Sequence, residues 1–225
     1  MKIAVIGTGK TGGKVFNLLG DQAVAFNTRN EPLPGKLKTC DAAIIFVPGN
    51  SAMPVYENVL ESGIPAVWGT TGFDWPADLD KKLKDKSLRW VIGSNFSMGM
   101  NLVRKAIGLF SEQASLLNSP EYHIHEVHHV HKKDAPIGTA LSWREWLGKE
   151  AEITSERKGD IKGIHELEIS TDNERIVLRH EALDRALFAE GAIWAVKQLL
   201  DDEKKPAPGL HSFADLFDSA AKLVD

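Results

Sequence analysis

Short apolar runs and longer amphipathic stretches alternate along the first part of the chain. Each apolar run ends at a glycine, proline or asparagine, which is typical of short buried strands. The predicted strands span residues 2–6, 23–26, 42–47, 66–68 and 88–92, and helical patterns lie at about 12–19, 51–62 and 76–85. This alternation predicts an α/β fold of the Rossmann type, a doubly wound parallel sheet with helices on both faces.

The pattern changes after Ser94. Apolar periodicity predicts helices over residues 98–117, 141–149 and 188–200, a strand over 122–128, and a hairpin of strands 166–170 and 175–180. Residues 204–209, KKPAPG, end the third helix. Ser212-Phe213-Ala214-Asp215 then predicts the start of a final helix, with Asp215 where a capping box usually has Glu or Gln. We therefore predict two domains with a junction near residue 95.

Composition limits the classes of partner and compartment. The 225 residues are 43% hydrophobic, which is sufficient for a packed core in one large or two small domains. A net charge of -4 gives no general attraction to nucleic acid or to anionic membranes, so neither is expected as a partner. The single cysteine, Cys40, excludes an internal disulfide and a cysteine-only metal cluster. Because no run approaches the ~20 apolar residues of a membrane span, we expect a soluble, cytoplasmic protein.

A glycine-rich loop follows the first predicted strand and opens the first predicted helix. Its sequence is Gly7-Thr8-Gly9-Lys10-Thr11-Gly12, the G-x-G-x-x-G pattern of dinucleotide binding in the required context. Gly7 suits the tight turn, Gly9 allows close approach of a pyrophosphate, and Gly12 allows the helix to pack on the strand. The alternative is a glycine-rich turn that binds nothing.

The cofactor preference depends on residues 27–30, Asn-Thr-Arg-Asn. NAD-binding domains usually place a carboxylate there to bind the adenosine ribose, but no acid occurs before Glu31. The planar guanidinium of Arg29 suits a 2′-phosphate instead. We therefore predict NADPH as the preferred cofactor and NADH as the second choice, unless Arg29 is a solvated loop residue.

The stretch from His128 to Ala140, HHVHKKDAPIGTA, concentrates proton carriers and cations. A metal site is one interpretation, but no H-E-x-x-H pattern occurs and the lysines would repel a cation, so no metal is predicted. Ordinary hydrogen bonding is a second interpretation, favoured for His123 and His125. In the third, a histidine donates a proton, Lys132 adds charge, and the amides of Gly138 and Thr139 bind an anion at a helix N-terminus. The third interpretation predicts a pocket for a substrate that carries carboxylates.

Several motifs, in the same order along nearly the whole chain, resemble those of the 4-hydroxy-tetrahydrodipicolinate reductase family. The longest runs from Glu126-Val127-His128-His129 through Lys132 to Asp134-Ala135-Pro136-Ile137-Gly138-Thr139-Ala140. The others are Gly69-Thr70-Thr71-Gly72, Asn95-Phe96-Ser97-Met98-Gly99, Arg157-Lys158-Gly159-Asp160 through Gly163-Ile164-His165, and Arg185 with Phe188-Ala189-Glu190-Gly191-Ala192. Ile137 stands where the family usually has serine, which removes one hydroxyl from the predicted pocket. Lys10-Thr11 replaces a frequent Arg-Met, which weakens the inference about cofactor preference.

The resemblance implies an enzyme of lysine and diaminopimelate biosynthesis. It would reduce 4-hydroxy-tetrahydrodipicolinate to tetrahydrodipicolinate with loss of water, using NAD(P)H, and two domains would close around the substrate. Residues 1–96, with the C-terminal helices at about 186–225, would bind the dinucleotide. Residues 97–185 would bind the substrate and form a mixed sheet that builds a homotetramer.

The resemblance also assigns roles to residues. His128 would donate the proton with Lys132 as its partner, and His129, Lys132, Gly138, Thr139 and the weaker candidate Arg185 would bind the substrate. Gly69, Thr70, Thr71, Asn95 and Phe96 would join residues 7–12 and Arg29 around the cofactor. Two other functions stay open: another two-domain NAD(P)-dependent amino-acid or sugar dehydrogenase, and a non-catalytic NADP-binding sensor.

Overall fold

The structure of the protein is a computed structural model of the 225-residue chain, and it describes residues 1–131, 135–136 and 138–221. The chain divides into two compact units. Unit one consists of Met1–Ser97 and Arg185–Asp225, and unit two is Met98–Asp184. The functions predicted for the two domains remain predictions.

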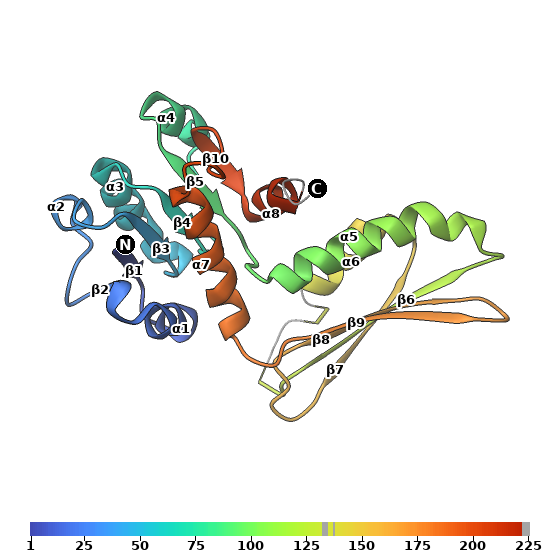
Figure 1. Ribbon diagram of the computed structural model, residues 1–225. Helices are drawn as coiled ribbons and strands as arrows, with labels where there is room; N and C mark the ends of the chain where they lie inside the picture. The colour runs from blue at the N-terminus through green and yellow to red at the C-terminus, as the bar shows by residue number, and fades with distance from the viewer. Residues whose placement is uncertain (132–134, 137, 222–225) are drawn as a thin grey trace. The chain divides into compact units, whose positions relative to one another are not determined.

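Unit one contains a six-stranded parallel sheet (Figure 1). Its strand order is β10-β5-β4-β3-β1-β2, with β1 between β2 and β3. The bounds are β1 Ile3–Ile6, β2 Ala23–Phe26, β3 Ala42–Ile45, β4 Ala66–Trp68, β5 Arg89–Ile92 and β10 Gly209–Ser212. The strands β1, β3 and β4 are buried at every position, which explains their uninterrupted apolar sequences.

Helices cover both faces of this sheet. The helices of unit one are α1 Lys10–Leu19, α2 Pro34–Leu37, α3 Ala52–Ser62, α4 Leu79–Asp85, α7 Ala186–Leu200 and α8 Phe213–Ala221. Apolar residues of α2, α3 and α4 form a core cluster with alternate residues of the strands. The helices α1 and α7 pack on each other and on the strands, and alternation of strand side chains places them on the opposite face. The Rossmann-type architecture predicted from the apolar pattern is confirmed.

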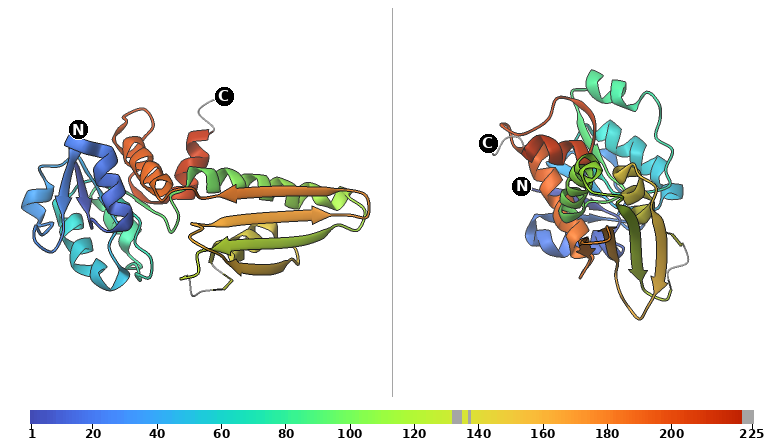
Figure 2. Two further views of the ribbon diagram at one scale, coloured as in Figure 1. Left: turned by 90° about the horizontal axis from the view of Figure 1, so that it is seen from below. Right: turned by 90° about the vertical axis from the view of Figure 1, so that its right-hand side faces the viewer.

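Unit two contains a mixed four-stranded sheet covered by helices (Figures 1 and 2). The strand order is β7-β6-β8-β9, with β6 parallel to β7 and antiparallel to β8. The elements are α5 Met98–Gln113, β6 Glu121–His128, α6 Gly138–Leu147, β7 Glu152–Arg157, β8 Ile164–Ser170 and β9 Arg175–Glu181. Figure 2 shows α5 running along β6, β8 and β9. Apolar residues of α5 and α6, including Ile107 and Trp143, pack against Ile124, Leu167 and Ile169 of the sheet.

The structure differs from the sequence-based expectations mainly at two short strands. Neither β7 nor β10 was expected, because β7 buries none of its six residues and β10 begins with glycine. Both strands exist through pairing, β7 with β6 and β10 with β5. The α6 helix begins at Gly138, a little before the expected start.

The predicted start of the last helix is confirmed in a modified form. The Ser212 hydroxyl accepts a hydrogen bond from the Asp215 amide (3.0 Å) and donates one to the Asp215 carboxylate (2.7 Å). The Asp215 carboxylate therefore accepts a hydrogen bond from the Ser212 hydroxyl. The longer Glu side chain of a capping box instead accepts one from the backbone N–H of the capping residue.

Among the described residues, the model contains no helix that combines the length and the apolar character needed to cross a membrane.

Candidate functional site

The strand register of unit two brings polar residues together on the face that α5 and α6 cover. Glu126 and His128 are two residues apart on β6, so their side chains point to the same side of the sheet. His165 on β8 is the cross-strand partner of Glu126, and Arg157 on β7 is the partner of His128. The four side chains therefore meet although they come from three strands.

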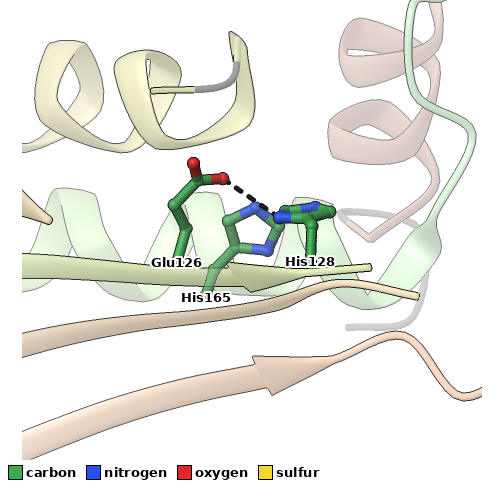
Figure 3. Close-up of side chains that lie close together, drawn as sticks. All are labelled: Glu126, His128 and His165. Carbon is green, nitrogen blue, oxygen red and sulfur yellow. Dashed lines mark ion pairs between the residues drawn. The ribbon is translucent and has the colours of Figure 1, made fainter. Parts of the chain in front are cut away.

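The cluster is buried and centred on a carboxylate. Glu126 is 0% exposed, and His128 and His165 are each 5% exposed. Arg157 donates a hydrogen bond from Nη2 to Glu126 Oε1 (3.1 Å), while Glu126 Oε2 lies 3.1 Å from His128 Nδ1 (Figure 3). Burial of an ionised carboxylate is costly unless it is paired, and Arg157 supplies the opposite charge.

His128 presents its second ring nitrogen, Nε2, toward Gly163. A Cβ atom added at Gly163 would lie 3.0 Å from Nε2, so a side chain at this position would crowd this nitrogen. The backbone at the end of β6 is fixed, because the Lys158 amide donates to the His128 carbonyl (2.8 Å). His128 thus has one nitrogen at a carboxylate and one beside a residue without a side chain.

His165 lies in the cluster close to the ring of His128 and the indole of Trp143. Its ring centroid lies 5.2 Å from that of His128 and 5.7 Å from that of Trp143. Burial, followed by the charges of His128 and His180, lowers the pKa of His165 to about 3. His165 is therefore neutral near pH 7, with a hydrogen on only one of its ring nitrogens.

We expect the buried His165 to make stability depend on pH. Its folded-state pKa of about 3 lies below the ordinary 6.5, so the unfolded chain binds more protons between these values and stability falls as pH falls. Between pH 7 and pH 5, the free energy of unfolding of the wild type should fall by about 2 kcal/mol more than that of His165→Asn. Urea denaturation at pH 7 and pH 5 measures the difference. Exposed His131→Asn is the matched control, and parallel pH curves for His165→Asn and wild type would refute the expectation.

The segment after β6 is described only in part. Lys132, Lys133, Asp134 and Ile137 lie outside the described residues, so the structure does not test the placement of the predicted lysine. His129 is half-buried, and its ring centroid lies 6.3 Å from that of His131. Gly138 and Thr139 are the first two residues of α6, so their N–H groups belong to the first turn, which has no intrahelical acceptor for them. This geometry suits an anion.

The side chains of Glu126, His128 and His165 could also be ligands of a metal ion. Ligand atoms of Glu126, His128 and His165 lie within 4.8 Å of one another, the one such group of three among the described residues. One Glu126 oxygen is already bound by Arg157, and the guanidinium beside it would repel a divalent cation. The arrangement suits the handling of a proton better than the binding of a metal.

His123 and His125 have the ordinary hydrogen bonds predicted for them. His125 Nδ1 lies 2.8 Å and His123 Nε2 lies 2.9 Å from the hydroxyl oxygen of Thr154 on β7. These side chains occupy the face of the sheet opposite to His128, since they are at odd positions of β6. They are separate from the buried cluster.

In unit one, the predicted cofactor residues follow the carboxyl ends of parallel strands. Residues 7–12 follow β1, Arg29 follows β2, Gly69, Thr70 and Thr71 follow β4, and Asn95 and Phe96 follow β5. The order β2-β1-β3 makes β1 the point at which the chain changes direction across the sheet, where α/β proteins bind nucleotides.

The glycine loop has the geometry that a pyrophosphate requires. Gly7 has a φ of 87°, and a Cβ there would lie 2.3 Å from the Phe46 carbonyl oxygen. A Cβ at Gly12 would lie 1.8 Å from the Gly7 carbonyl oxygen, which explains the close contact of α1 with the loop. A Cβ at Gly9 would meet nothing within 4 Å, so this backbone faces open space. The first turn of α1 contains no acidic residue and no side chain caps it, so its amides fit an anionic group.

Arg29 lies in a tight turn beyond β2. The Asn27 and Asn30 backbones are hydrogen-bonded to each other, and the Asn27 side chain accepts from the Arg29 amide (2.9 Å). The Arg29 side chain is exposed, and Lys36 donates to the Asn30 side chain (2.8 Å) nearby. Residues 27–30 thus offer one cation, Arg29, and no carboxylate, and Lys36 adds a second positive charge nearby.

The remaining predicted residues differ in exposure. Thr70 is 8% exposed and Thr71 is exposed, while Asn95 accepts a hydrogen bond from the Ser97 amide (2.9 Å). The Phe96 side chain is 1% exposed and packs between Phe46 and Phe213, so a contact with the cofactor would have to come from its backbone. Arg185 is exposed at the start of α7 in unit one. No ligand contact of any of these residues is tested by the structure.

Three residues of the cluster were not assigned a role from the sequence: Glu126, Arg157 and His165. The spacing Glu126-x-His128 on a predicted strand was a usable signal, because it places both side chains on one face. Arg157 and His165 were found only as members of a family-like motif, and the strand that carries Arg157 was not expected, so no pattern placed Arg157 beside Glu126.

Comparison with known proteins gives concordant matches. The family model described as dihydrodipicolinate reductase, C-terminus, matches residues 99–217. The chain is 33% identical over 205 residues to the 4-hydroxy-tetrahydrodipicolinate reductase of Pelagibacter ubique, a match that covers 80% of this chain and 76% of the relative. It is 36% identical over 179 residues to the enzyme of the same name from Xanthomonas campestris pv. campestris, covering 78% and 72%.

Solved structures agree on the fold. The dipicolinate-bound dihydrodipicolinate reductase from Paenisporosarcina sp. TG-14 superposes with a TM-score of 0.75 at 18% identity, covering 94% of this chain and 97% of that one. Aspartate dehydrogenase from Thermotoga maritima superposes less well, with a TM-score of 0.50 at 14% identity, covering 90% and 97%.

Proposed function

Because the chain belongs to the 4-hydroxy-tetrahydrodipicolinate reductase family, also called dihydrodipicolinate reductase, we propose how its own residues carry out the family's reaction. The chain is an NAD(P)H-dependent oxidoreductase that reduces 4-hydroxy-tetrahydrodipicolinate to tetrahydrodipicolinate, with loss of water, in lysine and diaminopimelate biosynthesis. When bound, the reduced nicotinamide supplies the hydride. The residues of the chain must bind the diacid, orient it and deliver a proton.

His128 is the proton donor in this proposal. The observation that carries the assignment is the buried contact of its Nδ1 with Glu126, which leaves Nε2 on the side of the ring that faces Gly163. A histidine can give a proton near neutral pH and regain it from solvent between turnovers.

A substrate carboxylate binds to the first turn of α6. The amides of Gly138 and Thr139 donate to it, and His129 and the positive charge of Lys132 add to its binding from the preceding segment. The Ile137 side chain supplies no hydroxyl at this place, so the backbone amides and Lys132 take a larger share of binding. Arg185 is a secondary candidate for the substrate.

A coupled assay tests the function directly. Purified protein should oxidise NADPH only when 4-hydroxy-tetrahydrodipicolinate is generated in the same mixture by a coupled reaction. NADPH binding without turnover of this substrate would favour a non-catalytic sensor. Turnover of an amino acid or sugar instead would favour the other two-domain dehydrogenases, whose similarity to this chain is one of fold.

NADPH is the preferred cofactor in this proposal, with NADH as the second. The support is the turn at residues 27–30, which has an exposed guanidinium and no carboxylate. We expect Arg29→Ala to weaken NADPH binding about tenfold and to change NADH binding little, because only NADPH has the 2′-phosphate. Titration of both cofactors by nicotinamide fluorescence measures the ratio of the dissociation constants.

The exposed Lys38→Ala at the end of α2 is the control for a general loss of positive charge in unit one. An unchanged ratio in Arg29→Ala would overturn the preference for NADPH.

We also propose a homotetramer assembled through the sheet of unit two. The face of this sheet opposite to α5 and α6 has the charged pairs Arg175–Glu168 and Arg179–Glu166, and Val177 between them is 51% exposed. Light scattering on the purified protein measures the mass. The cytoplasmic location stays a prediction from the sequence.

A further inference from the structure

Glu126 is a fully buried carboxylate that takes no direct part in the proposed reaction. Its strand position places it against the ring of His128, and the ring of its cross-strand partner His165 lies close to both. A buried carboxylate destabilises a fold unless its interactions repay the loss of hydration. An apolar residue at this position would satisfy packing, so the carboxylate calls for a functional explanation.

The two carboxylate oxygens have different neighbours. Oε1 accepts a hydrogen bond from Arg157 (3.1 Å), which balances the charge and fixes the rotation of the carboxylate. Oε2 lies 3.1 Å from His128 Nδ1 at ion-pair distance, without the alignment of a hydrogen bond. Catalytic contacts of this kind are often poorly aligned before the substrate binds and tighten in the complex.

His165 cannot replace His128 as the partner of this carboxylate in the charged state. Its pKa is lowered to about 3, chiefly by burial, so it stays neutral. Both of its ring nitrogens are buried and have no hydrogen-bond partner among the described residues. His128 is therefore the ring of this pair that benefits from the negative charge of Glu126.

We propose that Glu126, held by Arg157, is a positioning residue that keeps a hydrogen on Nδ1 of His128 and so makes Nε2 the atom that gives its proton to the substrate. This inference rests on the proposed role of His128. In the protonated ring both nitrogens carry hydrogen, and the carboxylate stabilises the positive charge. When the Nε2–H bond breaks, the proton goes to the substrate, and the ring is left as the neutral tautomer with hydrogen on Nδ1. The ring does not have to rotate or change tautomer between turnovers.

Other ionisable groups near this face stay the same when Glu126 alone is changed. They are Arg157 on β7, His165 on β8, His180 on β9, Arg104 and Lys105 on α5, Arg144 and Glu145 on α6, and His129 and His131 after β6. A change in pH dependence of a Glu126 variant therefore reports on the Glu126–His128 pair.

The kinetic test compares Glu126→Gln, Glu126→Asp and wild type. Glu126→Gln should lower kcat by about 10- to 100-fold with little change in the KM for the substrate, and should move the high-pH limb of the rate profile to lower pH. Glu126→Asp, which keeps the charge, should recover part of both effects. Glu156→Gln, on the half-exposed side chain beside His125, is the matched control and should behave as wild type. If the high-pH limb of the rate profile of Glu126→Gln lay at the same pH as that of the wild type, the proposal would be overturned.

Loss of folding is separated from loss of positioning by a second variant. Glu126→Gln leaves Arg157 without its counter-charge, so Glu126→Gln/Arg157→Gln removes both charges. A folded double variant that regains wild-type kcat and pH profile would show that Glu126 only neutralises Arg157, and would overturn the proposal. A folded double variant that keeps the kinetic defect supports it.

A spectroscopic test does not depend on turnover. In protein labelled with ¹⁵N at histidine, the His128 signals are identified by their loss in His128→Gln. At high pH they should show hydrogen on Nδ1 in wild type and a mixture of tautomers in Glu126→Gln. Hydrogen on Nε2 in wild type would overturn the proposal even if the enzyme is active. The protein could show hydrogen on Nδ1 of His128 and still fail to reduce the substrate. That result would contradict the proposed function but not the positioning role of Glu126.

Discussion

Replacement of His128 by alanine is expected to lower kcat by about 10²–10⁴-fold with a much smaller change in KM. The side chain is 5% exposed and lies between Glu126 and Gly163, with Nε2 on the glycine side. In the proposed mechanism its removal takes away the proton donor of the reduction, whereas the amides proposed to bind the substrate at the start of α6 are unchanged. Steady-state kinetics with NADPH held at saturation separates the two constants.

The matched control is His131→Ala, because His131 belongs to the same histidine-rich segment but is exposed. It should keep kcat within a few fold of wild type. If His128→Ala lost only cofactor affinity and kept its kcat, the proton would have to come from another group.

Replacement of Lys132 by methionine is expected to lower kcat/KM about 10²-fold or more, through both substrate binding and turnover. Methionine keeps the length and the apolar part of the side chain but removes the charge, so the loss measures the interaction of the ammonium with a substrate carboxylate. Lys132 lies between the end of β6 and the start of α6 in the sequence, the two places that hold His128 and the Gly138 and Thr139 amides. Cofactor affinity should not change.

The neighbouring Lys133→Met is the control, because it removes the same charge one position further along and should leave kcat/KM within a few fold of wild type. The effect of Lys132→Met should also shrink as salt is raised, since salt screens the attraction that the variant has lost. Normal kinetics in Lys132→Met would remove this residue from the site.

The sequence predicted the elements that have a clear pattern within their own segment, such as a continuous apolar run, an alternating hairpin or a glycine-rich loop. Strands β2 and β4 were expected at their observed bounds, because each is a short continuous apolar run, although only β4 is buried at every position. The β8–β9 hairpin was expected because alternating strands flank a short polar turn. The glycine loop was recognised because its backbone geometry allows few other residues.

The parts that the sequence did not predict depend on contacts between distant segments. The edge strand β7 has little apolar character of its own and forms because β6 offers it a partner. The cluster around His128 depends on two cross-strand registers, Glu126 with His165 and His128 with Arg157. A shift of either register by one residue would turn the partner side chain to the other face. A motif could therefore single out His128, but only the paired sheet shows which groups surround it.

A crystal structure with NADPH and pyridine-2,6-dicarboxylate bound tests the central claim most directly, that residues 128–139 bind a diacid beside His128. We predict carboxylate oxygens at about 3 Å from the amide nitrogens of Gly138 and Thr139, and Nε2 of His128 facing the ring of the ligand. A dicarboxylate that binds the protein but contacts none of residues 128–139 would contradict the claim.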